Sequence, residues 1–169
     1  MEFFQYVVYN DPMWDPPSIE FDSAADAADK AAADMLNVTN PNLKPFFDRG
    51  GKLLLYHGWN DQLVAPMNSV NYYKNIASIV GPTAASSVKL FKMPGTNHCA
   101  GGDGPNTFDR MKVIEQWVEQ KQTPSRIEAS HSTAGKVDRT RPLCAYPEVA
   151  RHTGTGSTDE AANFVCRMP

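Results

Sequence analysis

A short, wholly apolar run near the middle of the chain limits the folds that this sequence can adopt. Leu53–Tyr56 follows the pair Gly50-Gly51, and a polar loop begins at Gly58. Because a compact apolar run between such breaks is typical of a strand covered on both faces, it indicates a parallel sheet in an α/β fold. The 169 residues are enough to bury one hydrophobic core without a metal ion or a set of disulfides.

The next segments predict a helix and a second strand. Apolar residues recur at helical spacing over residues 67–80, after Pro66 at a first helical position, and Gly81-Pro82 ends the pattern. The run 87–93 has the composition of a strand and leads into a glycine-rich loop, 94–105.

A further helix is expected after this loop. Phe108–Val118 carries its apolar face, Asn106 or Thr107 can cap it, and Pro124 lies just beyond its end. Two strands joined by a right-handed helical crossover are parallel, so the loops that follow them open at the same edge of the sheet. Ligands of α/β proteins bind at that edge, and the two loops together therefore form the expected site.

The first part of the chain differs from this middle part. Acidic residues dominate it, and the alanine-rich stretch 24–36 predicts a helix that begins after Ser23, which resembles a capping box with Asp26. Residues 10–19 contain three prolines and are expected to form an extended connection.

The last part of the chain is rich in Gly, Ser and Thr past Pro124, so we expect a loosely structured tail. Three cysteines allow at most one internal bridge and leave one thiol, and a bridge between Cys144 and Cys166 would close this tail. These changes of texture divide the chain into residues 1–45, 46–125 and 126–169.

Composition and charge exclude several classes of partner. The formal charge of −3, with 41% hydrophobic and 21% charged residues, indicates neither disorder nor a surface for nucleic acid. The longest apolar stretches fall far short of the roughly 20 residues of a membrane span. Residues 1–6 lack the basic start and apolar core of a secretory signal. We therefore expect no nucleic acid and no membrane as partners, and no signal peptide in this chain.

Asp61 and His98 are the residues best placed for chemistry. Asp61 follows the first strand and His98 the second, so the crossover brings a carboxylate and an imidazole to one edge of the sheet. A carboxylate that orients an imidazole makes up two thirds of a nucleophilic triad. None of the ten serines stands in a G-x-S-x-G turn. The spacing alone slightly favours a simpler interpretation, in which Asp61 caps a turn and His98 is an ordinary loop histidine.

Other residues of these loops allow more than one interpretation. His57 could line the substrate pocket beside Asp61, or it could satisfy a backbone carbonyl at the end of its strand. Cys99 could be a small buried thiol. A metal cluster of His98, Cys99 and Asp103 is not expected, because adjacent ligands point apart in an extended loop and no second pair supports zinc.

Four segments form long motifs in a fixed order. They are GGKLLLYHGWND at residues 50–61, PGTNHCAGG at 94–102, RPLCAYP at 141–147 and FVC at 164–166. With residues 11–15 they resemble the tannase and feruloyl esterase family over nearly the whole chain. The resemblance implies the C-terminal part of an α/β-hydrolase core, with parallel strands, helical crossovers and a disulfide-closed tail. Residues 1–45 would then be the connection from a lid plus a helix, 46–125 the core with the acid and base loops, and 126–169 the tail.

The same resemblance implies a function. The family consists of secreted serine esterases that act on small aromatic, phenolic esters, with Asp61 matching the triad acid and His98 the base. The cysteine after the base bridges, in the family, to one beside the nucleophilic serine, so Cys99 is expected to stay unpaired. The family's calcium ion belongs to the lid, and no cofactor or metal ion is expected in this chain. We expect a C-terminal fragment that lacks the nucleophile and is inactive alone.

A different function is also compatible with the residues. The chain could be a non-catalytic module that binds a carbohydrate or phenolic ligand through aromatic side chains. The candidates for this role are Trp14, Trp59, Tyr72 and Tyr73. The same side chains fit core packing equally well.

Overall fold

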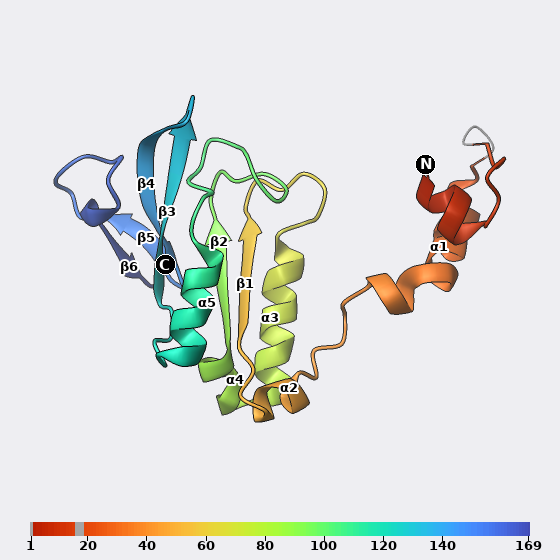
Figure 1. The fold of residues 1–169 in the computed structure, drawn as a ribbon, viewed down its shortest axis with the longest axis horizontal. Helices are drawn as coiled ribbons and strands as arrows, with labels where there is room; N and C mark the ends of the chain where they lie inside the picture. Colours follow the sequence, from red (N-terminus) through yellow and green to blue (C-terminus); the bar gives the residue numbers. More distant parts are fainter. Residues whose placement is uncertain (1, 16–18) are drawn as a thin grey trace. The chain divides into compact units, whose positions relative to one another are not determined.

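The computed structural model describes residues 2–15 and 19–169 and contains two compact units, residues 1–40 and 41–169 (Figure 1). The predicted segments 46–125 and 126–169 lie together in the second unit. None of the helices in the described residues is long and apolar enough to cross a membrane.

The first unit consists of a π-helix, η1 (Phe3–Val8), and α1 (Phe21–Leu36). Trp14 stacks on Phe4 and Tyr9, with ring centroids 5.6 and 5.1 Å apart. Helix α1 ends where the sequence predicts but begins three residues earlier, with Glu20 at its N-cap position. Ser23 is therefore not the cap: it lies inside the first turn, where its hydroxyl donates to the Glu20 carbonyl at 3.1 Å. Of the expected extended connection, residues 10–15 contain neither helix nor strand, and residues 16–18 lie outside the described residues.

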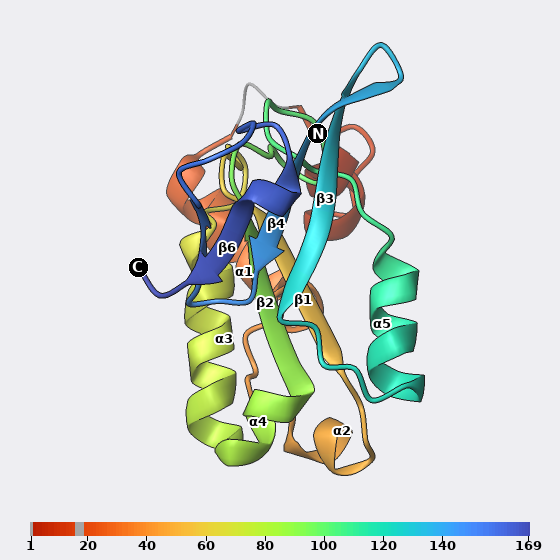
Figure 2. The same ribbon diagram turned by 90° about the vertical axis from the view of Figure 1, so that its left-hand side faces the viewer.

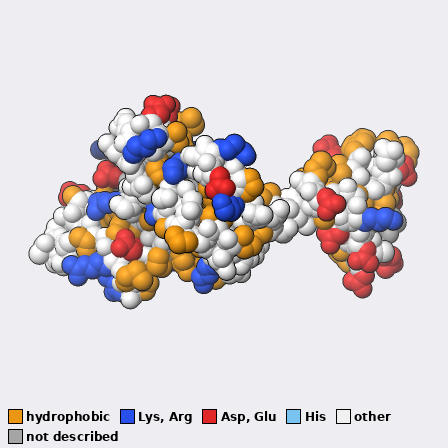
Figure 3. Space-filling model, turned by 90° about the horizontal axis from the view of Figure 1, so that it is seen from below, with side chains coloured by type: hydrophobic (Ala, Val, Ile, Leu, Met, Phe, Trp, Pro, Cys, Tyr) orange, Lys and Arg blue, Asp and Glu red, His pale blue; other side chains and the backbone are white. Residues whose placement is uncertain are grey.

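Charge is distributed unevenly between the two units. Residues 1–40 contain eight acidic residues and a single basic one, Lys30. On the face shown in Figure 3 the charged side chains of this unit are accordingly mostly acidic, whereas acidic and basic side chains are mixed on the second unit.

The second unit is built around two parallel strands. Strands β1 (Leu53–Gly58) and β2 (Val88–Met93) pair in register from Leu53 opposite Val88 to Gly58 opposite Met93. Helix α3 (Met67–Val80) and the short α4 (Pro82–Ser87) connect them. The predicted order of strand, helix and parallel strand is therefore confirmed, with Ser87 ending α4 instead of starting the strand.

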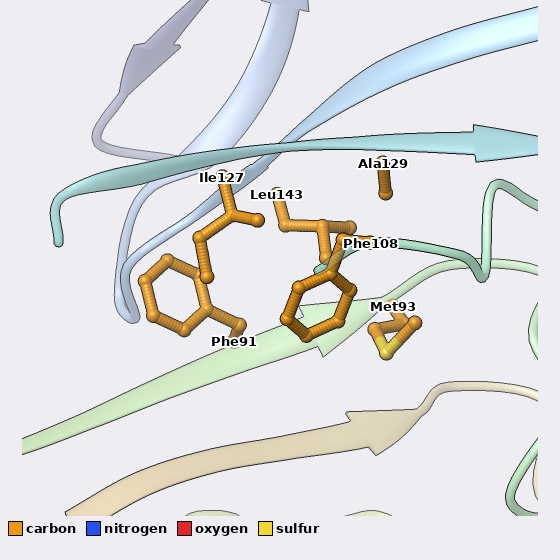
Figure 4. Close-up of a cluster of buried hydrophobic side chains, with 6 residues drawn as sticks. All are labelled: Phe91, Met93, Phe108, Ile127, Ala129 and Leu143. Atoms are coloured by element: carbon orange, nitrogen blue, oxygen red, sulfur yellow. The ribbon is translucent and has the colours of Figure 1, made fainter. Parts of the chain in front are cut away.

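Hydrophobic side chains cover both faces of this strand pair, and Figure 2 shows α3 and α5 (Arg110–Glu119) on opposite sides of it. Leu53, Leu55 and Val88 pack on the α3 side, with Phe47 of α2 (Lys44–Asp48). On the other side Phe91 and Met93 of β2 contact residues that come from later in the chain, namely Phe108, Ile127, Ala129 and Leu143 (Figure 4). Alternate residues of each strand thus supply the two layers.

Helix α5 begins later than the sequence predicts. Asp109 is its N-cap, and the Asp109 carboxylate accepts a hydrogen bond from the Lys112 backbone N–H at 2.9 Å. The two expected caps serve another purpose: the backbone N–H groups of Asn106 and Thr107 both donate to the Ser130 carbonyl, at 3.0 and 3.1 Å. These bonds join the loop before α5 to the tail.

The tail is more regular than expected, because residues past Pro124 form two antiparallel strand pairs. Strands β3 (Arg126–Thr133) and β4 (Lys136–Cys144) form a hairpin whose turn residues, Ala134 and Gly135, have φ values of 50° and 78°. Positive φ at both turn positions is the geometry that matches strand twist. Strands β5 (Val149–His152) and β6 (Phe164–Arg167) form the second pair, with a 3-10 turn, η3 (Ala161–Asn163), before β6.

Candidate active site

The loops that follow β1 and β2 meet at one end of the strand pair (Figure 1). The backbone N–H of Trp59 donates to the Met93 carbonyl at 2.8 Å, and that of Asn60 to the Thr96 carbonyl at 2.9 Å. A Cβ atom on Gly58 would collide with the carbonyl oxygens of Thr96 and Asn97. Only glycine permits this close approach, so the sequence at the end of β1 brings the two loops into contact.

Asp61 lies at the centre of this contact, and its carboxylate accepts four hydrogen bonds. Oδ1 accepts from the backbone N–H groups of Leu63 and Val64, at 2.8 and 2.9 Å. Oδ2 faces two imidazole nitrogens, Nδ1 of His98 at 2.8 Å and Nε2 of His57 at 3.1 Å. Asp61 therefore caps the turn after β1, as the simpler interpretation of the sequence expected. It also binds the His98 ring, as the catalytic interpretation expected.

The environment of Asp61 stabilises its charged form. Only 4% of its side chain is exposed, and this burial by itself would raise the pKa of the carboxyl. The hydrogen bonds from the Val64 and Leu63 backbone and from the two histidine rings outweigh burial. They hold the pKa of Asp61 well below its ordinary value of 3.8, so the group is an anion at neutral pH.

His98 is the more accessible partner of Asp61. Its side chain is 38% exposed, and no described residue is hydrogen-bonded to its Nε2 atom. The ring lines a cavity of about 280 Å³ together with Tyr56, His57, Asp61 and Cys99. The distance predicted from the topology, an Asp61 carboxylate within hydrogen-bonding reach of one His98 nitrogen, is confirmed. A base whose second nitrogen faces a cavity can take a proton from a bound reactant.

His57 is the second histidine on Asp61. Its ring is 12% exposed and also lines the cavity, but both of its nitrogens already contact protein groups. Nδ1 lies 2.6 Å from the Ser69 hydroxyl, on the first turns of α3. The sequence left His57 open between a pocket residue and a partner of a backbone carbonyl, and the structure places it beside the cavity. Ser69 was not singled out, because the helical periodicity of residues 67–80 reports only apolar positions.

The cysteines pair as expected. Cys144 and Cys166 form a disulfide, and Cys99 is free and exposed. The backbone of Cys99 has a φ of 61°, in the left-handed region that favours glycine. The loop therefore turns sharply just after His98, which leaves the thiol at the cavity surface instead of in the core. In the described residues no group of three or more His, Cys, Asp or Glu could hold a metal ion.

The aromatic residues of the alternative function lie in different surroundings. Trp14 belongs to the first unit, where it stacks on other rings. Trp59 lies 4.9 Å from the Lys92 ammonium, and Tyr72 and Tyr73 pack against the hydrophobic cluster under α3. The tyrosines thus contribute to the core.

Comparison with known proteins adds to this geometry. The family model described as tannase and feruloyl esterase matches residues 4–167. The chain belongs to the tannase and feruloyl esterase family. Mono(2-hydroxyethyl) terephthalate hydrolase of Piscinibacter sakaiensis is 39% identical over 143 residues, which are 83% of this chain and 24% of that protein.

Two further similar proteins are fungal. Feruloyl esterase B of Aspergillus niger is 27% identical over 183 residues, covering 98% of this chain and 35% of the relative. The crystal structure of feruloyl esterase B from Aspergillus oryzae superposes with a TM-score of 0.79 and 29% identity, over 98% of this chain and 36% of that one. The chain thus spans about a quarter to a third of the length of these esterases.

Proposed function

We propose that this chain supplies the acid and the base of a Ser-His-Asp triad in a carboxylic ester hydrolase that acts on aromatic, phenolic esters. The observation that carries the proposal is the 2.8 Å contact between Asp61 Oδ2 and His98 Nδ1 beside a cavity. Membership of a family of ester hydrolases supports the reaction class. The substrate class comes from the names of the relatives, which include feruloyl esterases and a terephthalate monoester hydrolase.

The mechanism follows from the protonation states at the site. His98 donates its Nδ1–H to Asp61, so Nε2 has a free lone pair that takes the proton of a serine hydroxyl as the hydroxyl oxygen attacks the ester carbonyl. Asp61 stabilises the resulting imidazolium, which then protonates the leaving alcohol as the acyl-enzyme forms. His98 then takes a proton from water as the water oxygen attacks the acyl carbonyl. It returns this proton to the serine oxygen as the bond between the acyl carbon and that oxygen breaks, which releases the aromatic acid.

The nucleophile of this proposal lies outside residues 1–169. None of the ten serines stands in a G-x-S-x-G turn, and no serine is among the residues that line the cavity. The chain would be the C-terminal part of an α/β-hydrolase core, and the substrate would be a small molecule bound in part by segments outside it. The disulfide favours an oxidising compartment, so we propose an exported protein.

The test is a chimera in which this chain replaces the matching third of Aspergillus oryzae feruloyl esterase B. We expect it to hydrolyse methyl ferulate and the isolated chain to show no measurable turnover. His98→Ala should lower kcat/KM of the chimera by at least about 10³-fold. His131→Ala is the matched control, because His131 contacts Asp138 at 2.6 Å in a similar pair on the β3–β4 hairpin.

Two results would contradict the proposal. The first is a chimera whose activity survives His98→Ala within a few fold. The second is turnover by the isolated chain that His98→Ala abolishes, which would mean that a serine inside residues 1–169 acts as nucleophile.

A further inference from the structure

The contacts of Asp61 extend beyond the proposed pair. From Ser69 on α3 to His98 after β2, four side chains form one continuous series: Ser69 Oγ to His57 Nδ1 at 2.6 Å, His57 Nε2 to Asp61 Oδ2 at 3.1 Å, and the same Oδ2 to His98 Nδ1 at 2.8 Å. We propose that Ser69 and His57 are positioning residues, which hold Asp61 in place and through it fix the orientation of His98. This inference deepens the proposed function and rests on it for its role in catalysis.

Proton accounting assigns the direction of each bond in the series. Asp61 is an anion and donates no proton, so a 3.1 Å contact with His57 requires a proton on Nε2. In the neutral imidazole Nδ1 is then an acceptor, and at 2.6 Å the Ser69 hydroxyl must donate to it. Asp61 accepts from both rings, and His98 therefore carries its proton on Nδ1.

The elements that carry these residues explain why the series can position His98. His57 is part of β1, which is paired along its whole length with β2. Ser69 lies in the first turn of α3, a helix of fourteen residues, next to the buried Val70. Asp61 and His98 instead belong to loops. The series thus ties two loop residues to a strand and a helix, and a site held by rigid elements keeps its geometry better than one on loops alone.

The connectivity of Ser69, His57 and Asp61 also resembles a second triad, but the surroundings of Ser69 argue against that role. A nucleophile must reach a bound reactant, whereas Ser69 is partly buried between α3 and β1 and is not among the residues that line the cavity. His57 likewise has no nitrogen left for a reactant. Both residues act through Asp61.

The test uses the 169-residue chain itself, labelled with ¹⁵N, at pH 8 and low temperature. Ring ¹⁵N shifts should show His57 protonated on Nε2 and bare on Nδ1, and His98 protonated on Nδ1 and bare on Nε2. This measurement on the unsubstituted chain needs no variant to fold. A His57 ring that is bare on Nε2, or protonated on both nitrogens, would overturn the inference.

Variants test whether the effect is transmitted across Asp61. Ser69→Ala should accelerate solvent exchange of the His98 Nδ1 proton about fivefold, the change expected when the loss of one neutral hydrogen bond favours opening. Ser69→Thr, which keeps the hydroxyl, should show the slow exchange of the parent chain. His57→Gln, which keeps a hydrogen-bond donor, should likewise show slower exchange of the His98 Nδ1 proton than His57→Phe. Ser78→Ala, at an exposed position of the same helix, is the matched control.

The outcomes separate this inference from the proposed function. If Ser69→Ala changes the His57 signals and leaves His98 exchange within twofold, or if Ser78→Ala has the same effect as Ser69→Ala, the positioning role is wrong whatever the chimera does. If the chimera retains activity without His98, the proposed function is wrong, whereas the ring ¹⁵N shifts of the 169-residue chain still test the series of contacts independently. In an active chimera, Ser69→Ala should lower kcat about fivefold and leave KM unchanged.

Discussion

The disulfide of the tail allows the most quantitative prediction. Cys144 and Cys166 are 22 residues apart in the sequence. Removing the bridge by Cys144→Ala and Cys166→Ala together releases a loop of that size in the unfolded chain. The chain-entropy relation gives about 11 cal/mol/K, or about 3 kcal/mol at 25 °C, for the resulting loss in the free energy of unfolding.

Contacts other than the bridge hold the folded tail, so the native structure should survive this substitution. The Arg126 guanidinium donates to the carbonyl oxygens of Phe164 and Ala161, at 2.9 and 2.8 Å. The Arg141 guanidinium lies 4.3 Å from the Phe164 ring, and β6 stays paired with β5. The loss should therefore come from the unfolded state, as the entropy relation assumes.

Urea unfolding followed by tryptophan fluorescence, to which the buried Trp117 contributes, measures this loss. With a slope of about 2 kcal/mol/M, the midpoint should fall by about 1.5 M. Cys99→Ala is the control and should leave the midpoint unchanged, and the unreduced parent chain should show one reactive thiol after denaturation. A loss below about 1 kcal/mol, or a double variant whose strand signal is already reduced without urea, would refute the reasoning.

Three further predictions concern the site and the core. Gly58→Ala should lower the free energy of unfolding by about 1–3 kcal/mol, because the new methyl group collides with the neighbouring loop; an unchanged urea midpoint would contradict the close approach. The lowered pKa of Asp61 means that, in acid, this carboxyl binds a proton more readily in the unfolded chain than in the native one. The contribution of Asp61 to the free energy of unfolding is therefore complete above about pH 4 and is lost as the pH falls below that value. Asp61→Asn should flatten that decline in acid titrations followed by circular dichroism, and an unaltered slope would argue against the charge-stabilising contacts. Phe91→Ala, at a fully buried position, should cost about 3–5 kcal/mol in thermal unfolding, against a small effect for Val137→Ala on the exposed side of the hairpin.

Local patterns in the sequence were sufficient for the elements around the site. The apolar run Leu53–Tyr56 and the helical spacing of residues 67–80 predicted β1 and α3 with errors of a residue or two. Their order predicted that Asp61 and His98 meet although 37 residues separate them. This was possible because a helical crossover between parallel strands leaves only one edge for both loops.

The sequence does not predict the strands of the tail, although it contains a signal for one of them. Ile127 and Ala129 are buried while the residues between and after them are more exposed, which is the alternation of a half-buried strand. The hairpin turn is formed by Ala134-Gly135, and only its second residue matches the Asn-Gly or Asp-Gly pair that usually predicts such a turn. The many Ser and Thr residues lowered the apparent strand propensity, which depends on what the strand packs against.

The sequence by itself determined the local elements and the pair of loops, since both follow from periodicity and connectivity. Only the tertiary structure decided that Asp61 is shared by two histidines and that Ser69 contacts the second of them. The spacing of apolar residues in α3 indicates which side of the helix faces β1. It does not indicate whether a polar residue on that side, such as Ser69, makes a specific hydrogen bond. Hydrogen bonds between residues from separate elements depend on side-chain positions within a few tenths of an ångström, and packing of the whole unit sets those positions.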